Sequence, residues 1–297
     1  MNPLDSGREQ PECRFPDFIC IGAQKAGTTW LDKNLRRHPK VWLPPVKEVH
    51  YFDDLYLPGA RAWTVDHRRR RGAQALRRYI QKTPIPEWDA RYIARIAEFV
   101  AAPLSDAWYG HLFGLAGKDK ICGEITPDYA TLPAEGIAHV LALNPQVKII
   151  LLLRDPIDRA WSHIRMMAHN RNVAGPENIA AFALEKGGVL RGAIARSDYP
   201  AILAAWRNAI PQNKLHIDFM DNISSNPAGV LEGVCAFLNI GFRSDLFPRS
   251  DQAVHVGEPL EIPPSVLTRL TTQLKPVYAA VAAMYPEIGA AWQARHF

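Results

Sequence analysis

Short apolar runs and helical patterns alternate along this chain. Five apolar runs predict β-strands, at 17–23, 41–43, 120–125, 147–153 and 215–219. Helices are predicted between and after these strands, at 28–37, 133–143, 156–169, 200–209, 227–238 and 264–284. Several of them begin at a Pro, Asn or Asp, which are typical helix-start residues. This alternation favours a parallel sheet, because parallel strands need crossovers that helices usually supply. The expected fold class is α/β, with three layers: a central, mainly parallel sheet flanked by helices.

One long segment departs from this alternation. Residues 54–118 hold no clear strand pattern, and they contain Pro, Arg and Trp throughout. We expect a helical insertion over the substrate cleft, since insertions at strand ends commonly carry specificity. Residues 1–14 are predicted to be a flexible N-terminus, which leaves 15–297 as a single domain. Six aromatic residues of the insertion either line an acceptor cleft or belong to the core: Trp63, Tyr79, Trp88, Tyr92, Trp108 and Tyr109.

The first strand leads into a loop of small residues. Backbone N–H groups in such a loop, together with the positive end of the following helix, form an anion site. The nucleoside-triphosphate pattern G-x-x-x-x-G-K-[ST] matches at Gly22 and Gly27, but Thr28 stands at the lysine position and Lys25 lies inside the loop. The loop is therefore P-loop-like, and we expect it to hold a different phosphate.

A second strand, turn and helix follow at 147–163. Arg154 stands at the carboxyl end of the predicted strand, Pro156 suits the first helical turn, and Ser162 follows two turns later. Open α/β sheets bind ligands at the carboxyl ends of their strands. Arginine offers a bidentate fork for phosphate there, with Ser162 as a further donor.

These two motifs, in this order, resemble the sulfotransferases that use 3'-phosphoadenosine 5'-phosphosulfate (PAPS) as donor. The resemblance implies that the first loop binds the 5'-phosphosulfate, while Arg154 and Ser162 bind the 3'-phosphate. It also implies that adenosine 3',5'-bisphosphate is the product and that no metal is required. For Trp30, the alternatives are stacking on adenine and packing in the core. The implied donor-binding residues are Lys25, Ala26, Gly27, Thr28, Thr29, Trp30, Arg154 and Ser162.

Two further segments resemble the heparan-sulfate and bacterial carbohydrate branch of that family. Residues 47–53 (KEVHYFD) are similar to its Lys-Glu-x-His-aromatic-Phe segment, in which the glutamate is taken as the catalytic base. Residues 123–129 (GEITPDY) are similar to its Gly-Glu-Lys-Thr-Pro-x-Tyr segment, with Ile125 replacing the usual lysine. That departure argues against assuming a heparan-type acceptor.

Sulfuryl transfer is an in-line displacement, so catalysis should come from positioning and charge stabilisation. Lys25 is expected to neutralise charge on the leaving phosphate oxygen. The catalytic base is expected to be Glu48, with His50 as the second candidate; both should share one face of an extended segment. The alternatives are an ion pair between Glu48 and Lys47, and a structural role for His50.

The family's late Lys-Gly-Arg loop is missing at 249–257, where Arg249 or His255 could substitute. Tyr199 belongs to a stretch similar to the family's Tyr-x3-Leu-x2-Trp helix, and we expect it to be structural. The acceptor is expected to be a glycan or small molecule: a carbohydrate, glycolipid or natural product with a hydroxyl, less favourably an amine. The sequence leaves its identity and the oligomeric state open.

Composition supports an enzyme without identifying it. The net charge of +5 would attract an anionic nucleotide and does not imply nucleic acid. The basic run 67–71 is either a solvated helix face or a docking site for an acidic acceptor. The four cysteines show no metal pattern, and two of them, Cys20 and Cys122, fall in predicted strands. No signal peptide or membrane span is predicted, which suggests a cytoplasmic enzyme.

Two other functional classes remain. A P-loop-type nucleotide kinase would need a lysine after Gly27 and a metal-holding carboxylate at a strand end, where Arg154 stands instead. A catalytically silent nucleotide-binding protein would keep the fold without a base.

Overall fold

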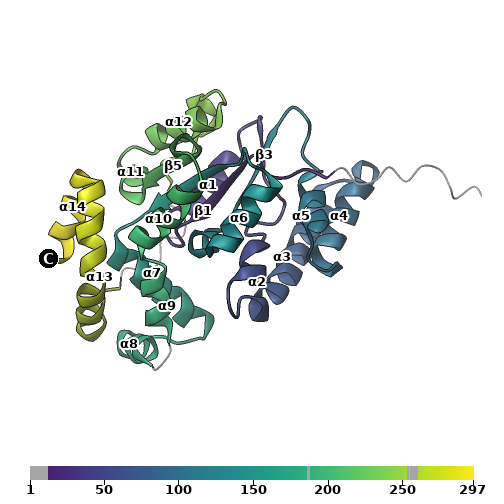
Figure 1. Cartoon of the computed structure of the whole chain (residues 1–297). Helices are drawn as coiled ribbons and strands as arrows, with labels where there is room; N and C mark the ends of the chain where they lie inside the picture. Colours follow the sequence, from purple (N-terminus) through teal and green to yellow (C-terminus); the bar gives the residue numbers. More distant parts are fainter. Residues whose placement is uncertain (1–12, 186–187, 253, 255–259) are drawn as a thin grey trace, which may run out of the picture.

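The computed structural model describes residues 13–185, 188–252, 254 and 260–297, and a five-stranded parallel sheet forms its centre (Figure 1). The strand order is β2-β3-β1-β4-β5, and every neighbouring pair is parallel. The strands are β1 (Phe18–Gly22), β2 (Val41–Trp42), β3 (Ile121–Ile125), β4 (Lys148–Leu153) and β5 (Leu215–Phe219). The α/β fold class and all five predicted strands are confirmed, with ends shifted by at most a residue.

Helices cover both faces of this sheet. The α-helices that lie between the first and fourth strands are α1 (Thr28–Leu35), α2 (Phe52–Tyr56), α3 (Arg61–Lys82), α4 (Ala90–Ala101), α5 (Asp106–Phe113) and α6 (Ala134–Leu143). Those that follow are α7 (Pro156–Asn170), α8 (Pro176–Leu184), α9 (Val189–Ala195), α10 (Tyr199–Ala209), α11 (Met220–Ser225), α12 (Pro227–Leu238), α13 (Pro264–Met284) and α14 (Pro286–His296). Right-handed crossovers place α1 and α6 on opposite faces, because the chain crosses the sheet in opposite directions at these helices.

The central strands are fully buried because helices cover both of their faces. In β1 and in residues 149–153 of β4, no side chain is more than 1% exposed. This burial explains their unbroken apolar sequence. All strands run in one direction, so the segments that follow β1, β3 and β4 meet at one edge of the sheet.

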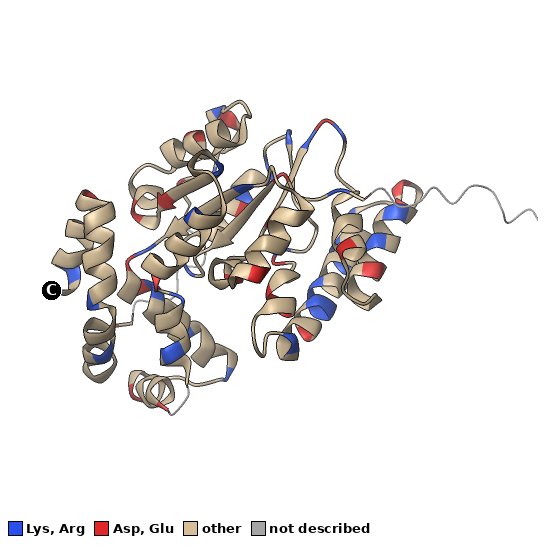
Figure 2. Ribbon diagram, in the orientation of Figure 1, with Lys and Arg blue, Asp and Glu red and all other residues tan. Residues whose placement is uncertain are grey.

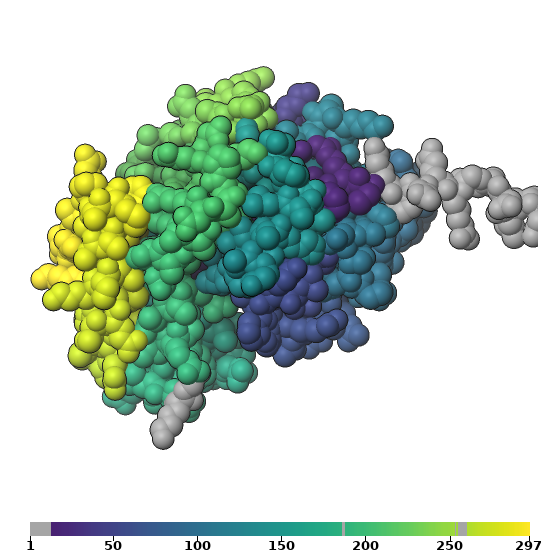
Figure 3. Space-filling model, viewed as in Figure 1, coloured from purple at the N-terminus to yellow at the C-terminus, as the bar shows by residue number. Residues whose placement is uncertain are grey.

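The segment 54–118 is helical, and α3 and α4 pack together within it. In the space-filling view, this segment lies at the opposite end of the molecule from the C-terminal helices α13 and α14 (Figure 3). Lys and Arg recur along α3 and α4 (Figure 2). Within the basic run, Arg69, Arg70 and Arg71 are exposed, whereas Arg68 is buried and stacks its guanidinium 5.5 Å from the Trp108 ring centroid.

Several helices were missed by the sequence patterns. The helices α8 and α9 are short, and apolar and alanine residues give them little amphipathic contrast. Helix α14 follows α13 after a single residue, where Pro286 begins a new helix instead of ending the domain. No described helix has both the length and the apolar character needed to cross a bilayer.

Candidate functional site

The loop between β1 and α1 is shaped to admit an anion. Lys25 has a φ of 72° and Gly27 has a φ of 92°. A Cβ at Gly27 would lie 2.7 Å from Ile223 Cδ1, so both backbone conformation and space favour glycine. Helix α1 starts at Thr28 with neither a side-chain cap nor an acidic residue in its first turn. Its N-terminal N–H groups therefore remain available for a bound anion.

Arg154 joins this loop to the second motif. Its Nη1 donates a hydrogen bond to the backbone oxygen of Lys25 at 3.2 Å. Burial lowers the pKa of Lys25, and the positive charges of Arg154 and Arg165 lower it further. Such mutual repulsion among cations is relieved when an anion binds between them. The two motifs, 129 residues apart in the chain, thus form one electropositive site.

The fully buried Arg159 supports the loop that follows β1. Arg159 Nε donates to Ser197 Oγ at 2.6 Å, and its Nη2 donates to the Ala193 backbone oxygen. Its Nη1 reaches the Gln24 backbone oxygen at 3.4 Å, so it holds the phosphate loop against α9. The Tyr199 hydroxyl donates to the backbone oxygen of Arg154 at 2.6 Å and the side chain is fully buried. This geometry favours the expected structural role of Tyr199.

Glu48 and His50 follow β2 with unusual backbone angles. Their φ values are 65° and 53°, so the segment is not extended and the argument that alternation places them on one face was wrong. The side chains nevertheless approach: His50 Nε2 lies 3.8 Å from Glu48 Oε2. Lys47 Nζ donates to Glu48 Oε1 at 2.6 Å, so the ion pair considered as an alternative is present. The Glu48 side chain keeps 27% of its exposure and can still meet a ligand.

The charges of these two residues differ in a way that separates their roles. Burial opposes ionisation of Glu48, but the His50 imidazole and the Lys47 charge outweigh it and hold the pKa of Glu48 well below its usual range. Burial disfavours the imidazolium of His50, yet Asp53 and Glu48 raise the pKa of His50 to about 10. Glu48 is therefore a carboxylate and His50 a cation, which favours Glu48 over His50 as proton acceptor.

A buried polar network fixes this segment. His50 Nδ1 donates to Asp53 Oδ2 at 2.8 Å, and the Val49 N–H donates to Thr126 Oγ1 at 3.1 Å. Thr126 in turn donates to Glu124 Oε2 at 2.7 Å, and the Tyr109 hydroxyl also donates to Glu124. Burial raises the pKa of Glu124 to about 7 despite these donors. The GEITPDY segment thus acts by holding the backbone that presents Glu48.

The remaining predicted site residues differ in how deeply they are buried. Thr28 and Trp30 are buried, and Thr29 and Ser162 are half-buried. Trp30 Nε1 donates to the Ser250 backbone oxygen at 2.7 Å with 3% of the residue exposed, which favours the packing alternative. Ile125 is buried in β3. Arg249 is exposed, while His255 lies outside the described residues.

Sequence reasoning missed four residues at this site. Arg159 and His163 stand one helical turn apart on α7, and His163 Nδ1 contacts Gln24 Oε1 at 2.5 Å. Their positions shortly after Arg154, on the helix that follows it, could have indicated that they lie near the same site. Asp53 belongs to the KEVHYFD segment and could have been paired with His50 by its position three residues on. The sequence could not show that His67 lies beside His50, because α3 approaches His50 only in the folded chain.

Comparison with known proteins identifies the family of this chain. The family model described as the sulfotransferase family matches residues 16–244. The membrane-associated sulfotransferase kil1 of Dictyostelium discoideum is 28% identical over 164 residues, covering 54% of this chain and 26% of that relative. Heparan sulfate glucosamine 3-O-sulfotransferase 3A1 of Mus musculus is 25% identical over 241 residues, covering 80% of this chain and 48% of the relative. The chain thus spans half or less of the length of these relatives.

Solved structures support the fold assignment. A sulfotransferase from Alicyclobacillus acidocaldarius superposes with a TM-score of 0.62 at 21% identity, covering 94% of this chain and 98% of that one. The sulfotransferase domain of a Synechococcus olefin synthase gives a TM-score of 0.52 at 17% identity, covering 89% of this chain and 97% of that one. Both similarities show that the P-loop-like α/β fold is shared.

Proposed function

Since the chain belongs to the sulfotransferase family, we propose that it transfers a sulfuryl group from PAPS to a hydroxyl acceptor. The observation that carries this proposal is the meeting of an uncapped phosphate loop, Lys25 and Arg154 with a carboxylate, Glu48, that interacts electrostatically with Lys25. One site therefore offers a cation for a leaving oxygen and a base for an attacking one.

The donor fits the described residues. The close approach of α11 at Gly27 and the unpaired helix start favour a phosphate group held by backbone N–H groups. Arg154 and Ser162 would hold the 3'-phosphate, and Ala26, Thr28 and Thr29 would line the 5' end. When bound, the donor supplies a sulfuryl group attached to a phosphate oxygen. Lys25 then neutralises the charge that remains on that oxygen after displacement.

The acceptor side is assigned to Glu48. Its carboxylate takes the proton of the acceptor hydroxyl while that oxygen bonds to sulfur, and a positioned base of this kind contributes roughly 10²- to 10⁴-fold. His50, held as a cation by Asp53, orients the carboxylate instead of accepting the proton. The low pKa of Glu48 keeps it ionised, at the expense of basicity.

For the acceptor class, we propose a carbohydrate or natural-product hydroxyl. Trp63 is 40% exposed and its ring centroid lies 4.6 Å from the His50 ring centroid, so it offers an apolar platform next to the base. Trp108 and Tyr109 are buried in the core and offer no such surface. Because Ile125 stands where the resembled branch has lysine, a strongly anionic polysaccharide is the less favoured acceptor.

The first test is calorimetric binding of adenosine 3',5'-bisphosphate and of ADP, each with and without magnesium. We expect tight, metal-independent binding that requires the 3'-phosphate. Arg154→Ala should weaken it by about 2 to 5 kcal/mol, because a buried charge contact is lost. Arg243→Ala is the matched control, since Arg243 pairs with Asp245 at the exposed surface. Preference for ADP with magnesium would instead revive the kinase alternative.

The second test follows transfer of labelled sulfate to a panel of sugars, glycolipids and phenols. Lys25→Ala should abolish transfer, whereas Glu48→Gln should bind the bisphosphate normally and lose most turnover. A Glu48→Gln variant at the full rate would exclude this base. Intact nucleotide binding with no transfer to any hydroxyl by the wild type would favour the catalytically silent alternative.

A further inference from the structure

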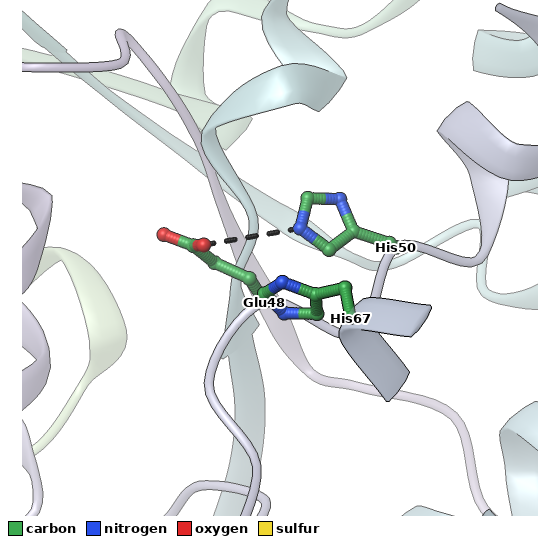
Figure 4. Close-up of side chains that lie close together, drawn as sticks. All are labelled: Glu48, His50 and His67. Atoms are coloured by element: carbon green, nitrogen blue, oxygen red, sulfur yellow. Dashed lines mark ion pairs between the residues drawn. The ribbon is translucent and has the colours of Figure 1, made fainter. Parts of the chain in front are cut away.

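Three potential metal ligands converge beside the proposed base. Glu48 and His50 come from the segment after β2, and His67 comes from α3 (Figure 4). One ligand atom from each lies within 4.8 Å of the other two. Two imidazoles and one carboxylate form the ligand set of many zinc sites, with a further position left open.

Both imidazoles present an unused nitrogen. The Nε2 atoms of His50 and His67 are buried and make no hydrogen bond in the structure. His50 is 1% exposed, so this orphaned nitrogen lies deep in the site, where leaving a polar atom unpaired is costly. Its 3.8 Å separation from Glu48 Oε2 is too long for a hydrogen bond and leaves a gap between the two atoms.

The surroundings of His50 also suit a metal ligand. Its other nitrogen, Nδ1, is hydrogen-bonded to Asp53 Oδ2 at 2.8 Å, and Asp53 is fully buried. A carboxylate behind a histidine orients the ring and increases its strength as a ligand. Trp63 packs edge-on against both rings, with centroid distances of 4.6 Å to His50 and 6.0 Å to His67, and restricts their motion.

We propose that Glu48, His50 and His67 bind a divalent transition-metal ion, with Zn²⁺ the best match, and that the bound ion blocks sulfuryl transfer. The ion displaces the proton on His50 Nε2, which is released to solvent. The donor set of two nitrogens favours such an ion over Mg²⁺ or Ca²⁺, which prefer oxygen ligands. Ligands of a tetrahedral zinc ion lie about 3.3 Å apart, so side-chain shifts of about 1 Å close the site.

Blocking follows from the identity of the first ligand. Glu48 Oε1 is already held by Lys47 at 2.6 Å, so the ion takes Oε2, and its positive charge lowers the basicity of the whole carboxylate. The ion is thus a reversible inhibitor and not a requirement for the reaction. The claim of inhibition rests on the proposed function, whereas the metal site itself does not.

Direct binding is the deciding experiment. The metal-free full chain is titrated with ZnCl₂ by calorimetry and with CoCl₂ by visible absorption, which reports the ligand geometry of bound cobalt. We expect one ion per chain at this site, no binding of MgCl₂, and loss of affinity in His67→Ala beyond the roughly 10- to 100-fold typical of outer-shell changes. His169→Ala, which removes an exposed histidine on α7, should bind zinc as the wild type does.

A ligand exchange guards against misfolding of the alanine variant. His67→Cys should retain zinc binding and add a sulfur-to-cobalt charge-transfer band, because thiolate is also a zinc ligand. A purely structural role for His67 predicts neither result. Equal zinc affinity in the wild type and in His67→Ala, or a His67→Cys spectrum without sulfur ligation, would overturn the site.

Activity then tests the consequence. Zinc should suppress sulfuryl transfer by the wild type, and a chelator should restore it. The transfer rate of His67→Ala should be the same with and without added zinc. Binding through His67 with no effect on transfer would show that Glu48 is not a ligand. If the protein transfers no sulfate to any acceptor but still binds zinc through His67, the proposed function fails and the metal site stands.

Discussion

At the scale of single residues, two neighbouring histidines differ in charge: His50 is a cation and His67 is neutral. The ring centroids of His50 and His67 lie 4.6 Å apart. Asp53 and Glu48 overcome the effect of burial and raise the pKa of His50 to about 10, whereas burial and the His50 charge lower the pKa of His67 to about 4. Contact with a buried carboxylate, and not residue type, decides which ring is charged.

This difference predicts a pH-dependent stability. Since the folded pKa of His50 is raised from 6.5 to about 10, its pairing with Asp53 stabilises the fold fully below pH 6.5 and ceases to do so as pH rises through 10. In chelator-treated protein, Asp53→Asn should lower the unfolding free energy by about 3 to 5 kcal/mol at pH 6, with a smaller loss at pH 9.5.

Urea unfolding of both proteins at several pH values measures this difference. Asp66→Asn on α3 is the control, because Asp66 is exposed. A constant difference between wild type and Asp53→Asn across the range would mean that His50 does not carry the charge assigned to it.

At the scale of elements, the phosphate loop depends on the close approach of α11 to the start of α1. Gly27 and Gly59 both have positive φ values, 92° and 75°. An added Cβ at Gly27 would collide with Ile223, whereas a Cβ at Gly59 would meet nothing within 4 Å. Substitution of Gly59 therefore tests the cost of backbone strain alone, whereas substitution of Gly27 adds the steric clash with Ile223.

We expect Gly59→Ala to cost about 1 to 2 kcal/mol of stability from its backbone conformation alone. Gly27→Ala should cost more and should also weaken binding of adenosine 3',5'-bisphosphate, because the loop must move away from α11. Thermal unfolding and calorimetry provide the two measurements. Similar losses in both variants, with unchanged nucleotide affinity in each, would contradict the role assigned to the close contact between Gly27 and Ile223.

Strand β3 carries a buried acid that supports the base segment. Burial raises the folded pKa of Glu124 from 4.5 to about 7. The folded state therefore binds more protons than the unfolded state between these pH values, and this group makes the fold less stable as pH rises from 4.5 to 7.

Glu124→Gln should remove that dependence. Relative to the wild type, the variant should gain about 3 kcal/mol between pH 4.5 and pH 8, whatever its stability at the acid end. Guanidinium unfolding at pH 4.5, 6 and 8 tests this, with Glu135→Gln at the exposed start of α6 as control. A parallel course for variant and wild type would mean that Glu124 ionises normally.

At the scale of the whole molecule, the C-terminal helices are tied to the site. Trp292 of α14 is fully buried, and its Nε1 donates to Asp221 Oδ2 at 2.9 Å. Its ring lies 6.3 Å from that of Tyr199, which holds the Arg154 backbone. The end of the chain thus reaches the edge of the sheet where the phosphate motifs meet.

Trp292→Ala should accordingly lower the unfolding free energy by about 3 to 5 kcal/mol, through lost burial and the loss of the hydrogen bond to Asp221 Oδ2. Trp88→Ala is the matched control: Trp88 is 39% exposed, so we expect about 1 kcal/mol or less. Chemical denaturation followed by circular dichroism distinguishes the two. Equal effects would show that α14 contributes little to the fold.

The sequence alone determined the sheet and the two strand-loop-helix motifs that contain Lys25 and Arg154. Apolar runs such as 147–153 must be buried on both faces, and the loop from Gly22 to Thr28 has a local pattern that covers only seven residues. The resemblance to a known family added Glu48 as the predicted catalytic base. Such features are readable because the signal lies in neighbouring residues, whose spacing directly constrains the backbone.

Only the tertiary structure decided which side chains meet. The bond from Arg154 to Lys25, the support from Arg159 and the approach of His67 to Glu48 join positions that the chain order separates. Positive φ values at Glu48 and His50 likewise arise where the Thr126 and Tyr129 side chains bind the segment's backbone. Charge states follow from burial and these contacts. They depend on the packed surroundings of each group, which no local pattern encodes.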